Sequence, residues 1–182
     1  PVFANMIQLY LGRLYLDNKE PDKARAHYEA IRSGSGDEDL AIAAQEAIVA
    51  TLAQEKRFQE ALDLYQQYLD THPDTSYKSK LLFGIGFMRN RLADTIEDPK
   101  RKKKEQDAAR AALNESIEMV RATMAEVLIE REKLGHVIQI SKIYREMGED
   151  DKALAELEAW IESHPDDPQN PTAMYEIAEI HY

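Results

Sequence analysis

Cysteine is absent from this chain of 182 residues, which also has a single tryptophan and no long apolar run. The lack of cysteine excludes disulfides and thiol catalysis, although it says little about compartment. No stretch approaches the ~20 apolar residues of a membrane span, so we expect no transmembrane segment. Basic residues are scarce: 23 stand against 34 acidic ones, for a formal charge of −11. That charge argues against specific binding of nucleic acid, which needs a basic face.

The patterns of catalysis and metal binding are also missing. No serine, threonine or lysine lies in a nucleophile motif, and no dinucleotide fingerprint is found. We therefore predict no catalytic residue, no metal site and no cofactor, and we expect the chain not to be an enzyme. None of the five histidines has the i, i+4 spacing of a helical metal pair: His27, His72, His136, His164 and His181. His72 and His164 each precede a proline at an expected helix end, where we expect them to cap the helix.

What the sequence does contain is a repeated pattern of helix pairs. Residues 42–73 predict two helices whose apolar positions recur at spacings of three and four. Three landmarks return 92 residues later (144−52, 153−61, 165−73): Leu52, Ala61 and Pro73 recur as Tyr144, Ala153 and Pro165. Ala24 lies 37 residues before Ala61, in a similar order of large, small and aromatic residues. One such pair cannot bury both of its apolar faces alone, so the copies predict a stack.

These units resemble the tetratricopeptide repeat (TPR), a two-helix unit of about 34 residues with a small residue where its helices cross. The resemblance covers nearly the whole chain and implies an all-α fold, a right-handed α-solenoid of antiparallel helix pairs with about 4.5 repeats. It predicts a single domain over residues 1–182, with units at approximately 3–36, 39–73, 75–133, 134–165 and 172–182. The third unit is enlarged and the last is truncated. Since the chain starts without methionine, we interpret it as a fragment of a longer protein.

The enlarged third unit carries two unusual segments. Gly84 lies inside an expected helix, and we attribute it to a close helix crossing, because a phosphate-binding loop would need a preceding strand. Residues 100–104 are an uninterrupted basic run, which we expect to be a mobile loop since lysine is unfavourable at a helix start. One long helix is predicted after it, from about Asp107 to Arg131.

The resemblance implies that the first helix of each pair lines a concave groove where peptides or partner helices bind. One helical stripe, shifted from unit to unit, predicts these partner-binding groove residues: Leu9, Arg13, Leu16, Glu46, Lys78, Leu81, Ile85, Met88, Arg89, Ile138, Lys142 and Arg145. Apolar and basic side chains dominate this stripe, so an acidic partner with apolar anchors would suit it. The family's carboxylate clamp is not expected, because Ala50 and Ile85 stand where it needs asparagines.

The leading hypothesis is a non-catalytic protein–protein interaction scaffold that binds a peptide or partner helix in this groove. Alternatively, Leu81, Ile85 and Met88 pack on the long helix instead of facing a partner. The second function considered is structural self-association, in which the chain forms a homo-oligomer through the long helix of the third repeat. A third hypothesis is that the basic run binds nucleic acid or the surface of an acidic membrane. The spacing in residues 68–92 is similar to that of bacterial envelope TPR proteins and favours the cell envelope or periplasm over the cytoplasm.

Overall fold

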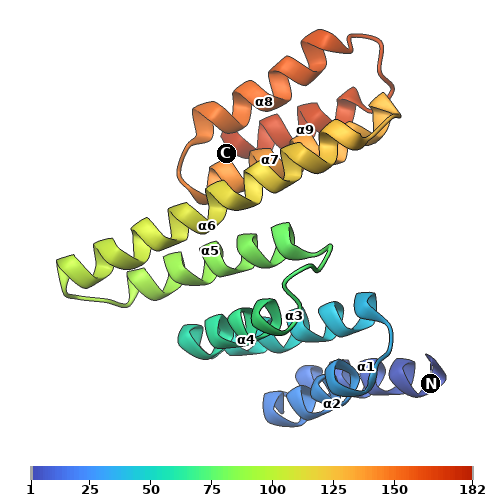
Figure 1. Ribbon diagram of the computed structural model, residues 1–182, viewed down its shortest axis with the longest axis vertical. Helices are drawn as coiled ribbons and strands as arrows, with labels where there is room; N and C mark the ends of the chain where they lie inside the picture. The colour runs from blue at the N-terminus through green and yellow to red at the C-terminus, as the bar shows by residue number, and fades with distance from the viewer. Residues whose placement is uncertain (1, 182) are drawn as a thin grey trace. The chain divides into compact units, whose positions relative to one another are not determined.

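The computed structural model describes residues 2–181, and every regular element within that range is a helix (Figure 1). The elements are α1 (Val2–Asp17), α2 (Pro21–Gly34), α3 (Glu38–Gln54), α4 (Phe58–Thr71), α5 (Lys78–Asp94), α6 (Pro99–Glu126), the short 3₁₀ helix η1 (Glu130–Glu132), α7 (Lys133–Glu146), α8 (Asp150–Ser163) and α9 (Asn170–His181). The predicted all-α class, built from consecutive helix pairs as in an α-solenoid, is confirmed.

The chain divides into two compact parts, unit 1 (Pro1–Pro73) and unit 2 (Asp74–Tyr182), and each is described by itself. Unit 1 contains α1–α4, and each helix packs against the next one in the sequence. Unit 2 contains α5–α9, in which α6 packs against α5 and α7, and α8 packs against α7 and α9. A single domain over residues 1–182 stays a prediction, and its two end residues lie outside the described range.

Small residues lie at the helix crossings, as the repeat pattern predicts. Ala24, Ala61 and Ala153 are each 0% exposed, so no larger side chain fits without moving a neighbour. At Gly12 of α1, an added Cβ would lie 2.5 Å from the ring of Tyr28 on α2, which is closer than van der Waals contact allows. The absence of a side chain at Gly12 is therefore what lets α1 and α2 approach.

The same turn geometry joins the two helices in each of three hairpins. Lys19, Lys56 and Gly148 have positive φ angles of 61°, 59° and 70°, and they are separated by the repeat offsets of 37 (56−19) and 92 (148−56) residues. In each turn, the backbone N–H of the next residue donates to the carbonyl oxygen four residues before the turn residue, at 2.8 to 2.9 Å. This bond satisfies a carbonyl at the end of the first helix. The offsets found in the sequence therefore mark equivalent backbone positions.

The histidines that end α4 and α8 cap these helices, as predicted. His72 Nδ1 lies 3.3 Å from the carbonyl oxygen of Tyr68, and His164 Nδ1 lies 3.1 Å from that of Trp160. Each ring also stacks on the same aromatic side chain, with ring centroids 4.4 Å apart in the first pair and 3.9 Å in the second. The equivalent polar residues Thr71 and Ser163 each approach the histidine Nδ1 to 2.9 Å.

One core cluster of unit 2 forms where α6 crosses α5 and α7. Leu113, Ile117 and Val120 of α6 are 1%, 3% and 2% exposed and belong to one cluster with buried isoleucines of α7. At Gly86 of α5, an added Cβ would overlap the side chain of Leu113 and lie 3.2 Å from the backbone oxygen of Ala109. Gly86 thus marks the close approach of α5 and α6. Gly84, for which we predicted that role, is buried in the same helix.

The basic run is helical, so the prediction of a loop over residues 100–104 is wrong. α6 begins at Pro99, and the side chain of Asp98 caps it by accepting a hydrogen bond from the backbone N–H of Arg101 at 2.7 Å. One turn later, Glu105 forms an ion pair with Arg89 of α5 at 2.5 Å. A capping carboxylate and a paired glutamate offset the unfavourable effect of the lysines on the helix dipole.

The long helix also differs in its bounds from the predicted residues 107–131. It starts eight residues earlier (107−99) and ends at Glu126, after which a short connection leads to η1. The apolar stripe that predicted the helix is used inside unit 2, because its first members are buried against α5 and α7. The long helix is therefore an integral part of the unit 2 core.

Candidate interaction surfaces

Three of the predicted groove residues are buried. Leu81, Ile85 and Met88 of α5 are 1%, 7% and 5% exposed. A side chain with so little accessible surface offers a partner almost no apolar area. We therefore exclude these three residues from the candidate surface. Their burial corrects the expectation that they face a partner. A repeating stripe identified α5 as amphipathic, but it did not indicate which of its apolar side chains would be covered.

The residues predicted on α7 do line a surface concavity of unit 2. Ile138 and Lys142 border a hollow of about 240 Å³ together with Phe83 of α5. Gly135 lies at its edge and contributes no side chain. Lys142 and Arg145 border a second hollow of about 350 Å³ farther along α7. We call the surface formed by Phe83, Ile138, Lys142 and Arg145 the α7 face.

The four basic residues of the predicted groove that lie in unit 2 already contact acceptors there. Lys142 Nζ lies 2.9 Å from Glu176 Oε1, and Arg145 donates to the carbonyl oxygen of Glu179 at 2.9 Å. Arg89 pairs with Glu105 at 2.5 Å, and Lys78 lies 3.7 Å from Glu115. Lys142 keeps 53% of its side chain exposed, so its ammonium group has further donors for a partner. Arg89 is better explained as a link between α5 and α6.

In unit 1 the predicted stripe lies on α1 and α3. Leu9 and Leu16 are half-buried, Arg13 is exposed, and Glu46 is half-buried and already engaged in an interaction. Their role in binding a partner stays a prediction. Other apolar side chains of α1 are strongly exposed: Phe3 by 76%, Met6 by 60% and Tyr10 by 68%.

Unit 1 also contains a groove that the sequence did not predict. It has a volume of about 750 Å³, within the size range of ligand pockets, and lies between α2 and α4 over α3. Its apolar lining consists of Ala26, Ile48, Leu52 and Leu64. Its polar lining consists of Asp22, Arg25, Glu29, Arg57, Glu60, Asp63 and Gln67. We call it the α2–α4 groove.

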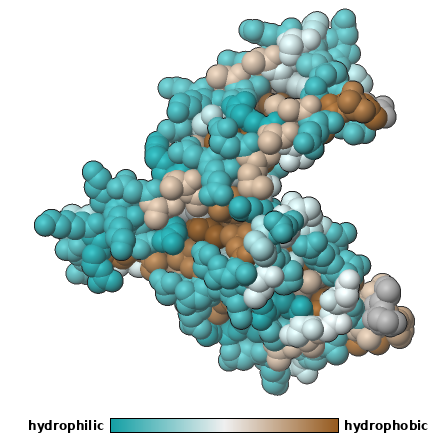
Figure 2. Space-filling view, in the orientation of Figure 1, coloured by the Kyte–Doolittle hydropathy of each residue, from teal (hydrophilic) through white to brown (hydrophobic). Residues whose placement is uncertain are grey.

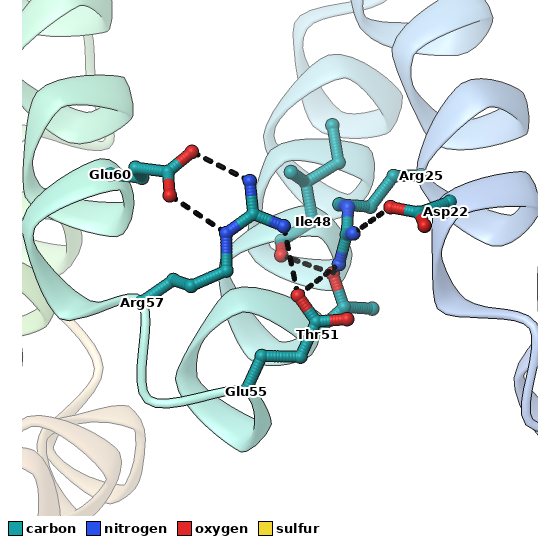
Figure 3. A network of polar contacts seen from close by, with 7 residues as sticks. All are labelled: Asp22, Arg25, Ile48, Thr51, Glu55, Arg57 and Glu60. Atoms are coloured by element: carbon teal, nitrogen blue, oxygen red, sulfur yellow. Dashed lines mark hydrogen bonds and ion pairs between the residues drawn. The ribbon is translucent and has the colours of Figure 1, made fainter.

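A network of ion pairs includes four of the residues that line this groove (Figure 3). Glu55, at the end of α3, accepts from Arg25 of α2 and from Arg57, both at 2.9 Å. Arg25 also binds Asp22, and its Nη1 donates to Thr51 at 3.3 Å. Arg57 makes two parallel hydrogen bonds to Glu60 of α4, each at 2.7 Å. Because Glu55 joins both arginines, the network ties α2, α3 and α4 together.

The arginines keep these carboxylates ionised. Hydrogen bonds from Arg25 and Arg57 lower the pKa of Glu55 below its ordinary value of 4.5. A hydrogen bond from Arg57 lowers the pKa of Glu60, and one from Arg32 lowers the pKa of Glu29. Hydrogen bonds to an ionised group favour its charged form. The groove rim therefore carries fixed negative charge at neutral pH.

We expect acid to destabilise unit 1 through this network. The folded-state pKa values of Glu55 and Glu60 lie below 4.5, so their stabilisation is complete above that pH and is lost as the pH falls through the folded values. Urea unfolding followed by circular dichroism should give a falling midpoint between about pH 5 and pH 3. Glu55→Gln should flatten this dependence, whereas Glu158→Gln, at an exposed position of α8, should leave it unchanged. An unchanged slope in Glu55→Gln would contradict the assignment.

Within residues 2–181, no group of histidine and carboxylate side chains is arranged to hold a metal ion. In the same range, no helix is both long and apolar enough to cross a membrane. Figure 2 shows a mostly hydrophilic surface with separate apolar patches. One patch lies at the connection between α6 and η1, where Leu128 is 95% and Ile129 is 50% exposed.

A match to a family model supports the TPR resemblance over part of the chain. A family model of the tetratricopeptide repeat matches residues 11–75, which include α2, α3 and α4. A crystal structure of a thermophilic TPR protein from Thermus thermophilus is similar over 97% of this chain and 98% of that one, with a TM-score of 0.48 and 16% identity. No curated protein sequence matches the chain. The predicted resemblance is therefore confirmed over residues 11–75.

Proposed function

We propose that this chain, whose residues 11–75 match the tetratricopeptide repeat, is a non-catalytic protein–protein interaction module that binds an acidic, apolar-anchored peptide on its α7 face. TPR repeats generally mediate protein–protein interactions, which gives the class of function. The site is suggested by one observation: Phe83 and Ile138 border a hollow beside the ammonium group of Lys142.

This arrangement provides both parts of a peptide subsite. An apolar side chain entering the hollow would lose water against Phe83 and Ile138. A neighbouring carboxylate would accept charge-assisted hydrogen bonds from Lys142 and Arg145, which border the next hollow. In unit 1, Leu9, Arg13, Leu16 and Glu46 stay a predicted partner-binding stripe that is separate from the α7 face. For the location of the protein, we keep the bacterial cell envelope as a proposal.

Self-association through the long helix receives less support. It needs exposed apolar side chains along α6, yet Leu113, Ile117 and Val120 are buried in unit 2. The exposed part of the helix at residues 100–104 is basic, and like charges on two copies would repel. The same basic run is short and belongs to a chain of net charge −11, which disfavours a nucleic-acid function.

We expect Lys142→Gln to weaken the binding of an acidic peptide by about tenfold, because the change removes a charge-assisted hydrogen bond. The probe is a short fluorescein-labelled peptide in which a phenylalanine is flanked by aspartate and glutamate. Fluorescence anisotropy measures its Kd for the wild-type chain and the variant. Ile138→Ser should weaken binding as well, since it removes apolar contact area from the hollow.

Lys152→Gln is the matched control for charge. Lys152 pairs with Glu149 at 3.0 Å and is 61% exposed, much as Lys142 pairs with Glu176 at 2.9 Å and is 53% exposed. The control lies on α8 and lines neither hollow of the α7 face, so it should leave the Kd unchanged. Equal losses from both changes would contradict the proposed site, as would equal binding of a peptide with lysines in place of the acids. Arg89 is left unchanged, because Arg89→Glu would place a carboxylate beside Glu105.

A further inference from the structure

We propose that the α2–α4 groove of unit 1 is a docking site for a basic segment of another protein, which places a leucine- or phenylalanine-sized side chain on the apolar floor and lysine or arginine side chains against the rim. This surface is separate from the α7 face of unit 2, and its charge preference is the opposite one. The inference therefore does not depend on the proposed function.

The floor of the groove suits a single apolar anchor. Ile48 and Leu52 of α3 are each 4% exposed, so they close the bottom of the groove and add little apolar surface themselves. The accessible apolar surface comes from Ala26, which is exposed, and Leu64, which is half-buried. Ala26 of α2 and Leu64 of α4 line the groove from the two sides. The small side chain of Ala26 leaves the space open, and the volume of about 750 Å³ exceeds what one side chain fills. The groove could therefore hold one apolar side chain together with the neighbouring residues of an extended segment.

The carboxylates of the rim are more exposed to solvent than its two arginines. Asp22, Glu29 and Glu60 have side chains that are 90%, 46% and 56% exposed. Arg25 is only 13% exposed and is held by Asp22 and Glu55, and Arg57 is 40% exposed and is held by Glu55 and Glu60. A partner approaching the groove therefore meets negative charge first.

The net charge of the groove lining also favours a basic partner. Four carboxylates line the groove against two guanidinium groups, which gives −2 (2−4), and both guanidinium groups are already paired with carboxylates. Complementary charge speeds encounter and suppresses partners of the wrong sign. An acidic segment or a nucleic acid would be repelled, whereas lysine and arginine side chains would find oxygen acceptors on both sides of the floor.

The ion-pair network prepares the groove for binding. Glu55 connects Arg25 of α2 to Arg57, which precedes α4, so ion pairs link the two walls of the groove (Figure 3). Side chains that are ordered before a partner arrives need not lose their freedom on binding. The rim therefore acts as a preorganised acceptor for cationic side chains.

The test uses the full chain and a short fluorescein-labelled peptide in which leucine and phenylalanine are flanked by lysine and arginine. Ala26→Tyr fills the groove without changing charge and should weaken binding at least tenfold. Asp63→Lys reverses one rim charge and should weaken it about fivefold, and added salt should weaken wild-type binding. Peptides with serine in place of the apolar residues, or with glutamate in place of the basic ones, should not bind.

Two matched controls separate groove binding from general charge effects. Ala30→Tyr adds the same ring to an exposed position of α2 that does not line the groove. Asp70→Lys makes the same charge change on α4, where Gln66 donates to Asp70 at 2.9 Å as Gln59 donates to Asp63 at 2.9 Å. Both controls should change the Kd less than twofold, and circular dichroism should show all four variants folded.

Binding that survives Ala26→Tyr, or that both controls weaken as much as the groove variants do, overturns the proposal. So does equal binding of the acidic peptide. A dimer that depends on concentration and is abolished by Ala26→Tyr, with no peptide binding, would overturn it in favour of a second copy as the occupant. The α7 face is judged separately, because Lys142→Gln should leave the basic peptide unaffected and Ala26→Tyr should leave the acidic peptide unaffected.

Discussion

The double variant Gly86→Ala, Leu113→Ala should be more stable than the sum of its two single changes predicts. Leu113→Ala alone opens a cavity at a position that is 1% exposed and should cost about 3 kcal/mol of unfolding free energy. Gly86→Ala alone places a methyl group onto Leu113 and should cost about 1–2 kcal/mol, because the overlap outweighs the helix propensity that alanine gains over glycine. In the double variant the new methyl group enters the space that Leu113 leaves, so we expect about 1–2 kcal/mol of favourable coupling.

Urea unfolding followed by tryptophan fluorescence measures this cycle. The single tryptophan, Trp160, is 5% exposed in the core of unit 2, so its emission reports the unit that carries both changes. Additive costs would show that the two changes do not interact. The side chain of Leu113 would then not require a glycine at position 86. A stabilised Gly86→Ala single variant would also contradict the close approach, since only helix propensity would then act.

Leu157→Ala should destabilise unit 2 by about 3 kcal/mol. Leu157 is 0% exposed and packs in one cluster with Trp160, Leu134 and Val137, so the change removes apolar contacts and leaves a cavity. We expect a lower melting temperature and a red-shifted Trp160 emission in the partly unfolded range.

Leu128→Ala is the control for this change. It makes the same substitution at a side chain that is 95% exposed, in the connection between α6 and η1, and should cost less than about 0.5 kcal/mol. Similar costs at both positions would mean that burial does not determine the effect, and would contradict the described core.

The repeat pattern predicted the helix pairs because crossings impose a local requirement on residue size. Ala24, Ala61 and Ala153 are small in the sequence and fully buried in the structure. The capping histidines could be predicted for the same reason, since a cap depends only on residues within one turn. The basic run was predicted wrongly, because part of what stabilises its helix is the ion pair between Glu105 and Arg89 across the α5–α6 connection.

The candidate sites were harder to predict, since they depend on contacts between distant residues. Ile138 and Lys142 lie on a hollow as the stripe predicted, whereas Leu81 and Ile85 follow the same spacing and are buried. Periodicity defines an apolar face but not what covers it. The α2–α4 groove gave no sequence signal, because its network joins Arg25 to a glutamate 30 residues away.

The packing order of the helices has a consequence for how the protein folds. Within each unit, the main contacts join helices that follow one another in the chain, and those between α7 and α9 skip only one helix. Such a low contact order shortens the loops that must close before native contacts form, which favours rapid folding. It also lets an outer hairpin fray while its neighbours stay intact.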